Sequence, residues 1–284
     1  MKKLFVLAIM TVLSVCAFAE DKLHSFQVAA EVSNYKYREP HTMNLKAFPK
    51  AGFSIKYLRR SVLSKELLEE DPSFASLEFR YMTGDVDYTG GRFDGTPLSL
   101  KGMKDYYIEA GLRIGKEYHL SYDWRVGPYL GLGWRQLTNH LEQGGEGGYL
   151  RESRYFYMPL GFDFRYTTYG GWDVVWNGEF DWLIKGSQYS GTMADAVDIG
   201  GVTYDLEPNR NSQDDGYGLR TSLKIEKAFG EKIGIFVEPF VRYWHIQNSD
   251  IGYKRISGTS WAVEGFYEPK NYTWEYGLKA GVSF

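Results

Sequence analysis

The chain is poor in cysteine and histidine and has no long apolar run beyond its first residues. Its only cysteine is Cys16, and five of its 284 residues are histidines. If a leader that contains Cys16 is removed, the mature protein has no cysteine, and neither a disulfide framework nor thiol chemistry is possible. The net charge of −3 argues against a nucleic-acid partner. Mean hydropathy is −0.40, and beyond residue 17 no stretch approaches the roughly 20 apolar residues of a membrane helix.

The first residues have the pattern of a secretory signal. Met1–Lys3 is a short basic start, and an apolar run follows over 4–17. Ala17 and Ala19 are small residues at the two positions that a signal peptidase reads. We therefore expect a signal peptide at 1–19, with the mature domain at 20–284. An uncleaved anchor is the alternative, but the apolar run is short for a spanning helix.

The last thirteen residues alternate strictly. Every second residue from Tyr272 to Phe284 is apolar or aromatic, and the residues between them are polar or small. A period of two places one kind of side chain on each face of a β-strand. The chain therefore closes with an amphipathic strand that ends on a phenylalanine.

This closing strand resembles that of the bacterial outer-membrane β-barrel family, whose last strand ends in an aromatic residue read by the barrel-assembly machinery. Tyr276, Val282 and Phe284 carry the resemblance, while Lys279 stands where the family often has glycine. The resemblance implies the outer membrane of a Gram-negative bacterium. It also implies the assembly machinery and periplasmic chaperones as partners, and outer-membrane lipid and lipopolysaccharide as surroundings. An aromatic content of 17% agrees with girdles at two lipid interfaces.

Similar alternation recurs along the chain and predicts nine further strands. They cover residues 26–32, 51–57, 77–81, 106–114, 126–134, 156–164, 174–184, 217–225 and 233–243. With the closing strand, the pattern predicts an all-β, antiparallel, up-and-down transmembrane barrel of ten strands. The segment Val197–Tyr204 resembles a hairpin on a Gly-Gly turn. Its arms are too short to span, so we expect an extension above the membrane; counted as a spanning pair, it would make twelve strands.

The connections between these strands differ in length. If both termini are periplasmic, the long connections that start at Gly84, Asn139, Gly186 and Gln247 all lie outside. The short turns near Glu117, Thr167 and Ala228 then lie on the periplasmic side, as is usual for such barrels. The segment from Arg59 to Pro72 is long for a periplasmic turn.

If the apolar residues face lipid, the alternate residues face the lumen. These include acids and bases in about equal number: Glu78, Arg80, Glu109, Arg113, Arg135, Asp163, Arg165, Glu179, Asp181, Arg220, Lys224, Glu226, Glu238, Arg242, Glu275 and Lys279. Opposite charges in a narrow barrel favour an interior filled by ion pairs. A conducting pore is the alternative, although selectivity rings usually carry one dominant sign.

Ten strands with acidic outer loops also resemble the omptin proteases, whose site sets two aspartates against an Asp-His pair. Asp85 and Asp87 match the first half of that site. The loop that would supply the second half, 186–215, has no histidine. His245, with Asp250 nearby in sequence, is the substitute candidate for a base that activates water.

Other site chemistry has little support in the sequence. A hydrolase of the lipid A deacylase type would need a histidine and a serine on the outer wall. The adjacent pair His24-Ser25 lies at the start of the first strand, on the wrong side of the barrel for that activity. No acidic loop has the Ca²⁺ spacing, so we expect neither a metal nor a cofactor. The sequence thus favours a barrel whose surface loops serve binding, adhesion or envelope maintenance, with an unidentified extracellular ligand. A small porin and an omptin-like protease are the alternatives.

Overall fold

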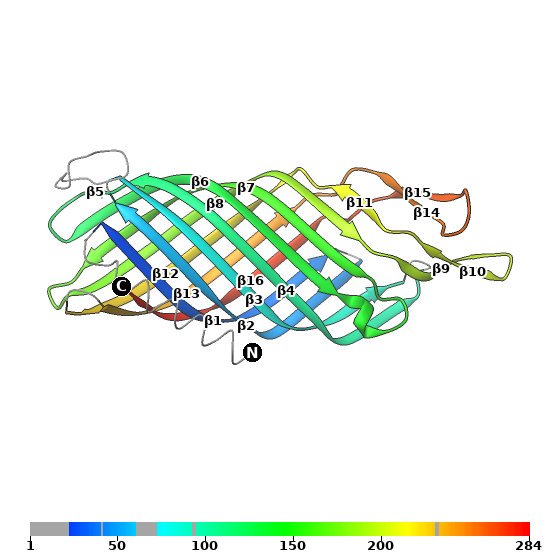
Figure 1. The fold of residues 1–284 in the computed structure, drawn as a ribbon, viewed down its shortest axis with the longest axis horizontal. Coiled ribbons are helices and arrows are strands. Elements are labelled where there is room, and N and C mark those ends of the chain that lie inside the picture. The colour runs from blue at the N-terminus through cyan, green and yellow to red at the C-terminus, as the bar shows by residue number, and fades with distance from the viewer. Residues whose placement is uncertain (1–22, 41, 61–72, 93–94, 231–232) are drawn as a thin grey trace.

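Long antiparallel strands form one barrel in the computed structural model, which describes residues 23–40, 42–60, 73–92, 95–230 and 233–284 (Figure 1). The wall strands are β1 (His24–Glu39), β2 (Met43–Arg60), β3 (Ser73–Gly91), β4 (Pro97–Lys116), β6 (Trp124–His140), β7 (Leu150–Thr167), β8 (Trp172–Ser190), β12 (Gly216–Phe229), β13 (Ile233–Ile246) and β16 (Asn271–Ser283). The shorter elements are β5 (Tyr118–His119), the 3-10 turn η2 (Leu141–Gly144), β9 (Met193–Ile199), β10 (Val202–Leu206), β11 (Asn209–Ser212), β14 (Gly252–Arg255) and β15 (Ala262–Phe266). Among the described residues, no helix has the length and apolar character needed to cross a membrane.

The wall closes between its first and last strands. Each wall strand pairs antiparallel with its neighbours in chain order, and β1 pairs with β16 from Gln27–Ser283 to Arg38–Tyr272. Beyond that register, the Phe26 amide donates to the Phe284 carbonyl at 3.0 Å, and the reverse bond is 2.8 Å. The ten-stranded antiparallel barrel predicted from alternation is confirmed. The hairpin β9–β10 forms a separate two-stranded sheet, so the twelve-strand alternative is wrong.

The two faces of the wall have opposite chemistry. Large apolar side chains point outward, and those of Val32, Leu77 and Leu130 are 43%, 55% and 57% exposed. The charged side chains of Arg80 and Glu275 on the inward face are buried. This arrangement is the inverse of a water-soluble fold and suits a wall surrounded by lipid.

The two ends of the barrel differ. At the short-turn end, β4 leads to β6 through the two-residue strand β5, and Thr168–Gly171 connects β7 to β8. At the long-loop end, the wall continues into the hairpins β9–β10 and β14–β15, which project from the barrel (Figure 1). The Gly186–Asp215 connection therefore contains three short strands, one of which, β11, pairs with β8.

Two connections predicted as loops are strands over much of their length. The expected glycine-rich loop 84–104 is mostly a hairpin, because β3 runs to Gly91 and β4 starts at Pro97. The connection between the predicted strands 26–32 and 51–57 likewise belongs largely to β1 and β2. These hairpins persist because their inward residues form an apolar core, described below. The predicted signal peptide and most of the 59–72 connection lie outside the described residues.

Candidate functional site

The charged residues predicted for the lumen all occupy inward positions of their strands. On β4, Glu109 and Arg113 are buried, while Leu112 and Ile114 between and beside them are exposed. The same alternation holds on β3, β6, β7, β8, β12, β13 and β16. We call the following residues the ion-pair network: Glu31, Glu78, Arg80, Glu109, Arg113, Arg135, Glu179, Asp181, Arg220, Glu238, Arg242, Glu275 and Lys279.

Glu109 lies at the centre of this network. Its Oε2 is 2.5 Å from Nη1 of Arg242, 3.4 Å from Nη1 of Arg220 and 3.5 Å from Nη1 of Arg80. Its Oε1 is 3.4 Å from Nε of Arg135. One carboxylate on β4 thus contacts guanidinium groups from β3, β6, β12 and β13. Ion pairs between non-neighbouring strands must cross the bore, so this contact set fills the middle of the barrel.

Arg80 extends the network toward the seam between β1 and β16. Its Nε donates to Glu31 at 2.5 Å, and its two terminal nitrogens donate to Glu275 at 2.7 and 3.1 Å. The Tyr107 hydroxyl also donates to Glu275. The fork of an arginine can satisfy two carboxylates at once, which fixes their relative positions.

A second group of pairs lies toward β8 and β12. Arg113 donates to Glu179 at 2.6 Å and to Glu78 at 3.0 Å. Arg220 lies 2.5 Å from Asp181. Lys279 is 3.6 Å from Glu78 and 3.5 Å from Glu238. The remaining predicted charges also pair locally: Lys224 with Glu226 at 2.7 Å, and Arg165 with Asp173 at 2.8 Å. Asp163 accepts from Asn177 at 2.8 Å.

A polar cavity of about 410 Å³ occupies the lumen at the short-turn end. Residues near the turns, such as Glu117 and Thr167, line one end of it, and Arg113, Arg220 and Arg242 line the other. The cavity therefore extends from this end of the barrel up to the ion-pair network.

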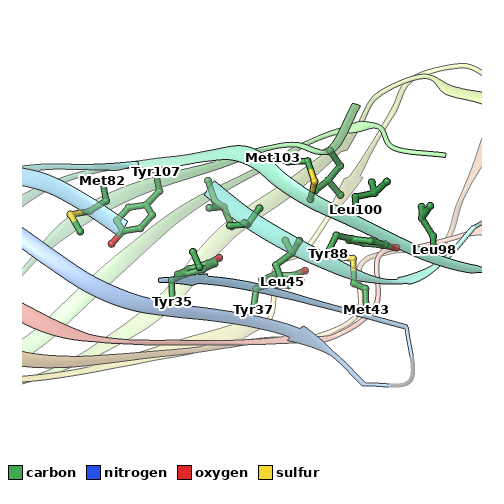
Figure 2. Close-up of a cluster of buried hydrophobic side chains, with 14 residues drawn as sticks. Tyr35, Tyr37, Met43, Leu45, Met82, Tyr88, Leu98, Leu100, Met103 and Tyr107 are labelled. Atoms are coloured by element: carbon green, nitrogen blue, oxygen red, sulfur yellow. The ribbon is translucent and has the colours of Figure 1, made fainter. Parts of the chain in front are cut away.

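An apolar cluster lies in the bore on the long-loop side of the network (Figure 2). It comprises buried residues of β1, β2, β3, β4, β6 and η2: Tyr35, Tyr37, Met43, Leu45, Ala47, Met82, Val86, Tyr88, Leu98, Leu100, Met103, Tyr107, Leu137 and Leu141. Within it Lys50 and Asp105 form an ion pair with fully buried side chains, and Asn139 also donates to Asp105. The Lys50 ammonium lies 3.8 Å from the centre of the Tyr35 ring. Buried charges are tolerated when they are paired and hydrogen-bonded, as these are.

A cavity of about 300 Å³ opens at the long-loop end; we call it the mouth cavity. Its walls include Tyr88, Arg92, Glu146, Tyr149, Asp195 and Tyr267. Glu39 and Glu268 line its inner part, and both contact Nη2 of Arg151, at 2.6 and 3.0 Å. Burial raises the pKa of the Tyr149 phenol, with a partly opposing effect of Arg151. Asp195 has a φ of 49°, a left-handed conformation that is uncommon outside glycine and often marks a functional site.

The four catalytic candidates do not assemble into a site. Asp85 and Asp87 lie at outward, exposed positions of β3, where Asp85 pairs with Lys104 and Asp87 accepts from the Gly102 amide at 3.1 Å. Asp250 accepts from the Ser212 amide at 2.6 Å, which ties two outer connections together.

His245 also points outward. Its ring stacks on Tyr272 with centroids 4.7 Å apart and meets the edge of Tyr217 at 5.4 Å. The strands β2, β1 and β16 separate β13 from β3 along the wall. His245 is therefore part of an outward aromatic band, and the geometry does not bring it to Asp85 or Asp87. In the part of the chain that the structure describes, no group of three His, Cys, Asp or Glu side chains is arranged to hold a metal.

Several residues of the filled lumen were not predicted. Glu31 lies between Ala30 and Val32, so the alternation of the first strand could have identified it. Arg151 lies four residues before the inward Tyr155, so the same period of two places Arg151 on the inward face of β7. The Lys50–Asp105 pair could not be found, because both residues fall in or beside segments read as loops.

Comparison with known proteins supports the fold. No protein-family model matches the sequence, and curated proteins give no match. Among solved structures, the chain is similar to the outer membrane protease OmpT of Escherichia coli, with a TM-score of 0.61 and 12% identity over 93% of this chain and 97% of that one. It also matches the translocator domain of the autotransporter NalP of Neisseria meningitidis, with a TM-score of 0.42 and 9% identity over 96% and 94% of the two chains.

The chain has the fold of the outer-membrane β-barrels. At 12% identity, the likeness to OmpT shows the fold alone.

Proposed function

We propose that this protein is an outer-membrane barrel with a closed lumen, which binds a saccharide in its mouth cavity. In this proposal both termini are periplasmic and the hairpins β9–β10 and β14–β15 extend outside the cell. The asymmetry between short turns at one end and long connections at the other supports this orientation.

The observation that carries the closed lumen is the position of Glu109. It contacts Arg220 of β12 and Arg242 of β13, which are not neighbours of β4, so these two ion pairs cross the bore instead of lining its wall. The apolar cluster adds a second layer between this network and the mouth. An ion would have to break buried pairs and then cross an apolar region, and both steps are costly.

The lining of the mouth cavity supports a saccharide. Tyr88, Tyr149 and Tyr267 supply aromatic rings with polar tips, and Arg92, Glu146 and Asp195 supply charged donors and acceptors. Tyrosine rings contribute contact area at low entropic cost, while a few convergent polar groups fix a ligand's orientation. Sugar rings present an apolar face and a rim of hydroxyl groups, which match such a lining.

Planar-bilayer recording tests the closed lumen. The purified mature protein should insert without steady single-channel currents over a range of voltages and salt concentrations. Steady currents that change when Arg113 or Arg242 is replaced would instead establish a porin.

A glycan array with the folded protein in detergent tests the binding site. We expect a subset of glycans to bind, and the substitution Tyr267→Ala to abolish that binding because it removes a half-exposed ring from the cavity. Tyr253→Ala, which removes an exposed tyrosine from β14, is the matched control and should bind as the wild type does. Binding that Tyr267→Ala leaves intact would reject the mouth cavity as the site.

A further inference from the structure

The outward face of the seam between β1 and β16 changes character along its length. In the register of this pair, Arg38 lies opposite Tyr272, and Lys36 lies opposite Trp274. Farther toward the short-turn end, Val32 lies opposite Leu278, followed by the pair Ala30–Ala280. Cations and aromatic rings therefore give way to aliphatic side chains within one continuous stripe. From Lys36 to Ala30 the stripe covers about 20 Å of strand.

The polar end of this stripe is hollowed. A groove of about 320 Å³ is lined by Lys36, Arg38, Pro40, Tyr272 and Trp274. Lys36 and Arg38 are exposed, and neither has an ion pair with another described residue. The outward cations around the groove differ in this respect: Lys104 pairs with Asp85 and Arg154 with Glu152 at 2.6 Å, whereas Lys46, which lies opposite Lys36 on β2, is exposed and has no ion pair with another described residue. The groove thus holds two positive charges that the protein itself does not neutralise.

The groove lies level with the aromatic band. Tyr272 stacks on Tyr243 with centroids 6.4 Å apart and on His245 at 4.7 Å, and Tyr243 lies 4.6 Å from Trp274. Tyrosine and tryptophan concentrate where a membrane wall passes from hydrocarbon to headgroups. Lys36 and Arg38 therefore lie at headgroup height, where lipid phosphates are found.

We propose that this groove, Lys36–Arg38–Tyr272–Trp274, is a specific site for a phosphorylated membrane lipid of the lipid A type. Its phosphate accepts hydrogen bonds from the Lys36 ammonium and the Arg38 guanidinium, and arginine forks match phosphate geometry well. Its acyl chains lie along Val32, Leu278, Ala30 and Ala280. The site is on the outer wall, so it depends on the proposed orientation but not on a ligand in the mouth cavity.

The probe that tests this site is a fluorescent bisphosphorylated lipid A, titrated into the folded mature protein in a zwitterionic detergent. The double variant Lys36→Gln/Arg38→Gln should weaken binding by at least about tenfold, since it removes two charge-assisted contacts to phosphate. The variant Lys101→Gln/Lys185→Gln changes net charge equally at other exposed positions of the wall, on β4 and β8. It should bind within about twofold of the wild type.

Two further arms separate a lipid site from a phosphate site. Dephosphorylated lipid A should bind the wild type as weakly as the bisphosphorylated form binds the double variant. Inorganic phosphate at the concentration of the lipid should not displace the probe. Equal loss in both double variants, or displacement by inorganic phosphate, overturns the proposal. Channel currents or a failed glycan array would overturn the proposed function without changing this titration.

Discussion

Glu109 shows how much a single residue can contribute to closing a barrel of this size. Its carboxylate is shared by Arg80, Arg135, Arg220 and Arg242, which come from strands on different sides of the bore. Arg80 and Arg135 are buried and do not line the polar cavity, so their guanidinium groups cannot recover water if their partner is lost. The net gain from a buried pair is small, but removing one member leaves uncompensated charge.

The substitution Glu109→Gln should therefore destabilise the barrel strongly. We expect a loss of about 3 kcal/mol in the free energy of unfolding. This is the lower end of the range for a broken buried pair, because neighbouring carboxylates of the network still partly compensate the arginines. Urea titration of the protein in lipid vesicles, followed by gel mobility, measures this loss. Glu146→Gln is the control. It breaks the ion pair between Glu146 and Arg92, which lie 3.6 Å apart, and the Glu146 side chain is 73% exposed. That variant should lie within about 0.5 kcal/mol of the wild type. Equal stability of the two variants would mean that the network does not hold the barrel closed.

Single residues also show what the sequence could and could not reveal. The alternation of two identifies Glu109 and Arg80 as inward-facing, because neighbouring positions are unmistakably apolar. It cannot identify the partners, since Glu109 and Arg242 are 133 residues apart and their approach depends on the closed bore. For Asp85 and Asp87 the same alternation, extended past Tyr81, places both on the outer face. Reading that stretch as a loop concealed this and left the protease comparison open.

At the scale of elements, the hairpin extensions depart most from the sequence-based expectation. Glycine and polar residues between the spanning segments suggested loops, yet β3 and β4 continue to pair through Gly91 and Pro97. Inward residues such as Val86, Tyr88, Leu98 and Leu100 hold the extension together as part of the apolar cluster. On β3 the alternation continues through Val86 to Tyr88, but on β4 it is interrupted between Leu100 and Met103, so a strict period of two could not follow the second arm.

The β14–β15 hairpin is attached to the barrel through Lys254. The Lys254 ammonium is buried, donates to the Gly191 carbonyl at 2.7 Å, and lies 5.6 Å from the centre of the Phe266 ring. Burial lowers the pKa of Lys254 from 10.5 to about 8, and Glu268 opposes the shift. An unfolded or detached hairpin would bind more protons than the docked one between these two pH values.

Docking of this hairpin should accordingly strengthen as the pH rises from about 8 to 10.5, and it should not change below pH 8, where lysine is protonated in both states. Hydrogen exchange of the β14 and β15 amides, corrected for the intrinsic pH dependence of exchange, measures the docking equilibrium. Lys254→Met removes the titrating group and should abolish this rise in docking strength. Any change in docking that comes from tyrosine ionisation would remain in this variant. A rise of the same size in Lys254→Met would assign the effect to other groups.

At the scale of the whole molecule, the barrel and its outer hairpins are separable units. The wall closes through β1 and β16, whereas β9–β10 pairs only with itself apart from a single bridge from Leu206 to Ile256. Closure was predictable, because ten amphipathic segments leave no other way to satisfy the backbone in lipid. An interior of ion pairs was also expected from the alternation, but the apolar layer beside it was not, because that layer lies in segments read as loops.

Replacing residues 194–205 with a short Gly-Ser linker tests this separation. The β9–β10 hairpin contributes nothing to wall pairing, so the variant should keep the heat-modifiable gel shift of a folded barrel, with a melting midpoint close to that of the wild type. Because Asp195 and its neighbours line the mouth cavity, glycan binding should be lost at the same time. Deleting residues 271–284 is the opposite control: it removes β16, leaves β1 and β13 unpaired on one side, and should abolish the shift. Loss of the shift in the linker variant would show that the hairpin is needed for the barrel to fold, and would rule out the mouth as an independent binding unit.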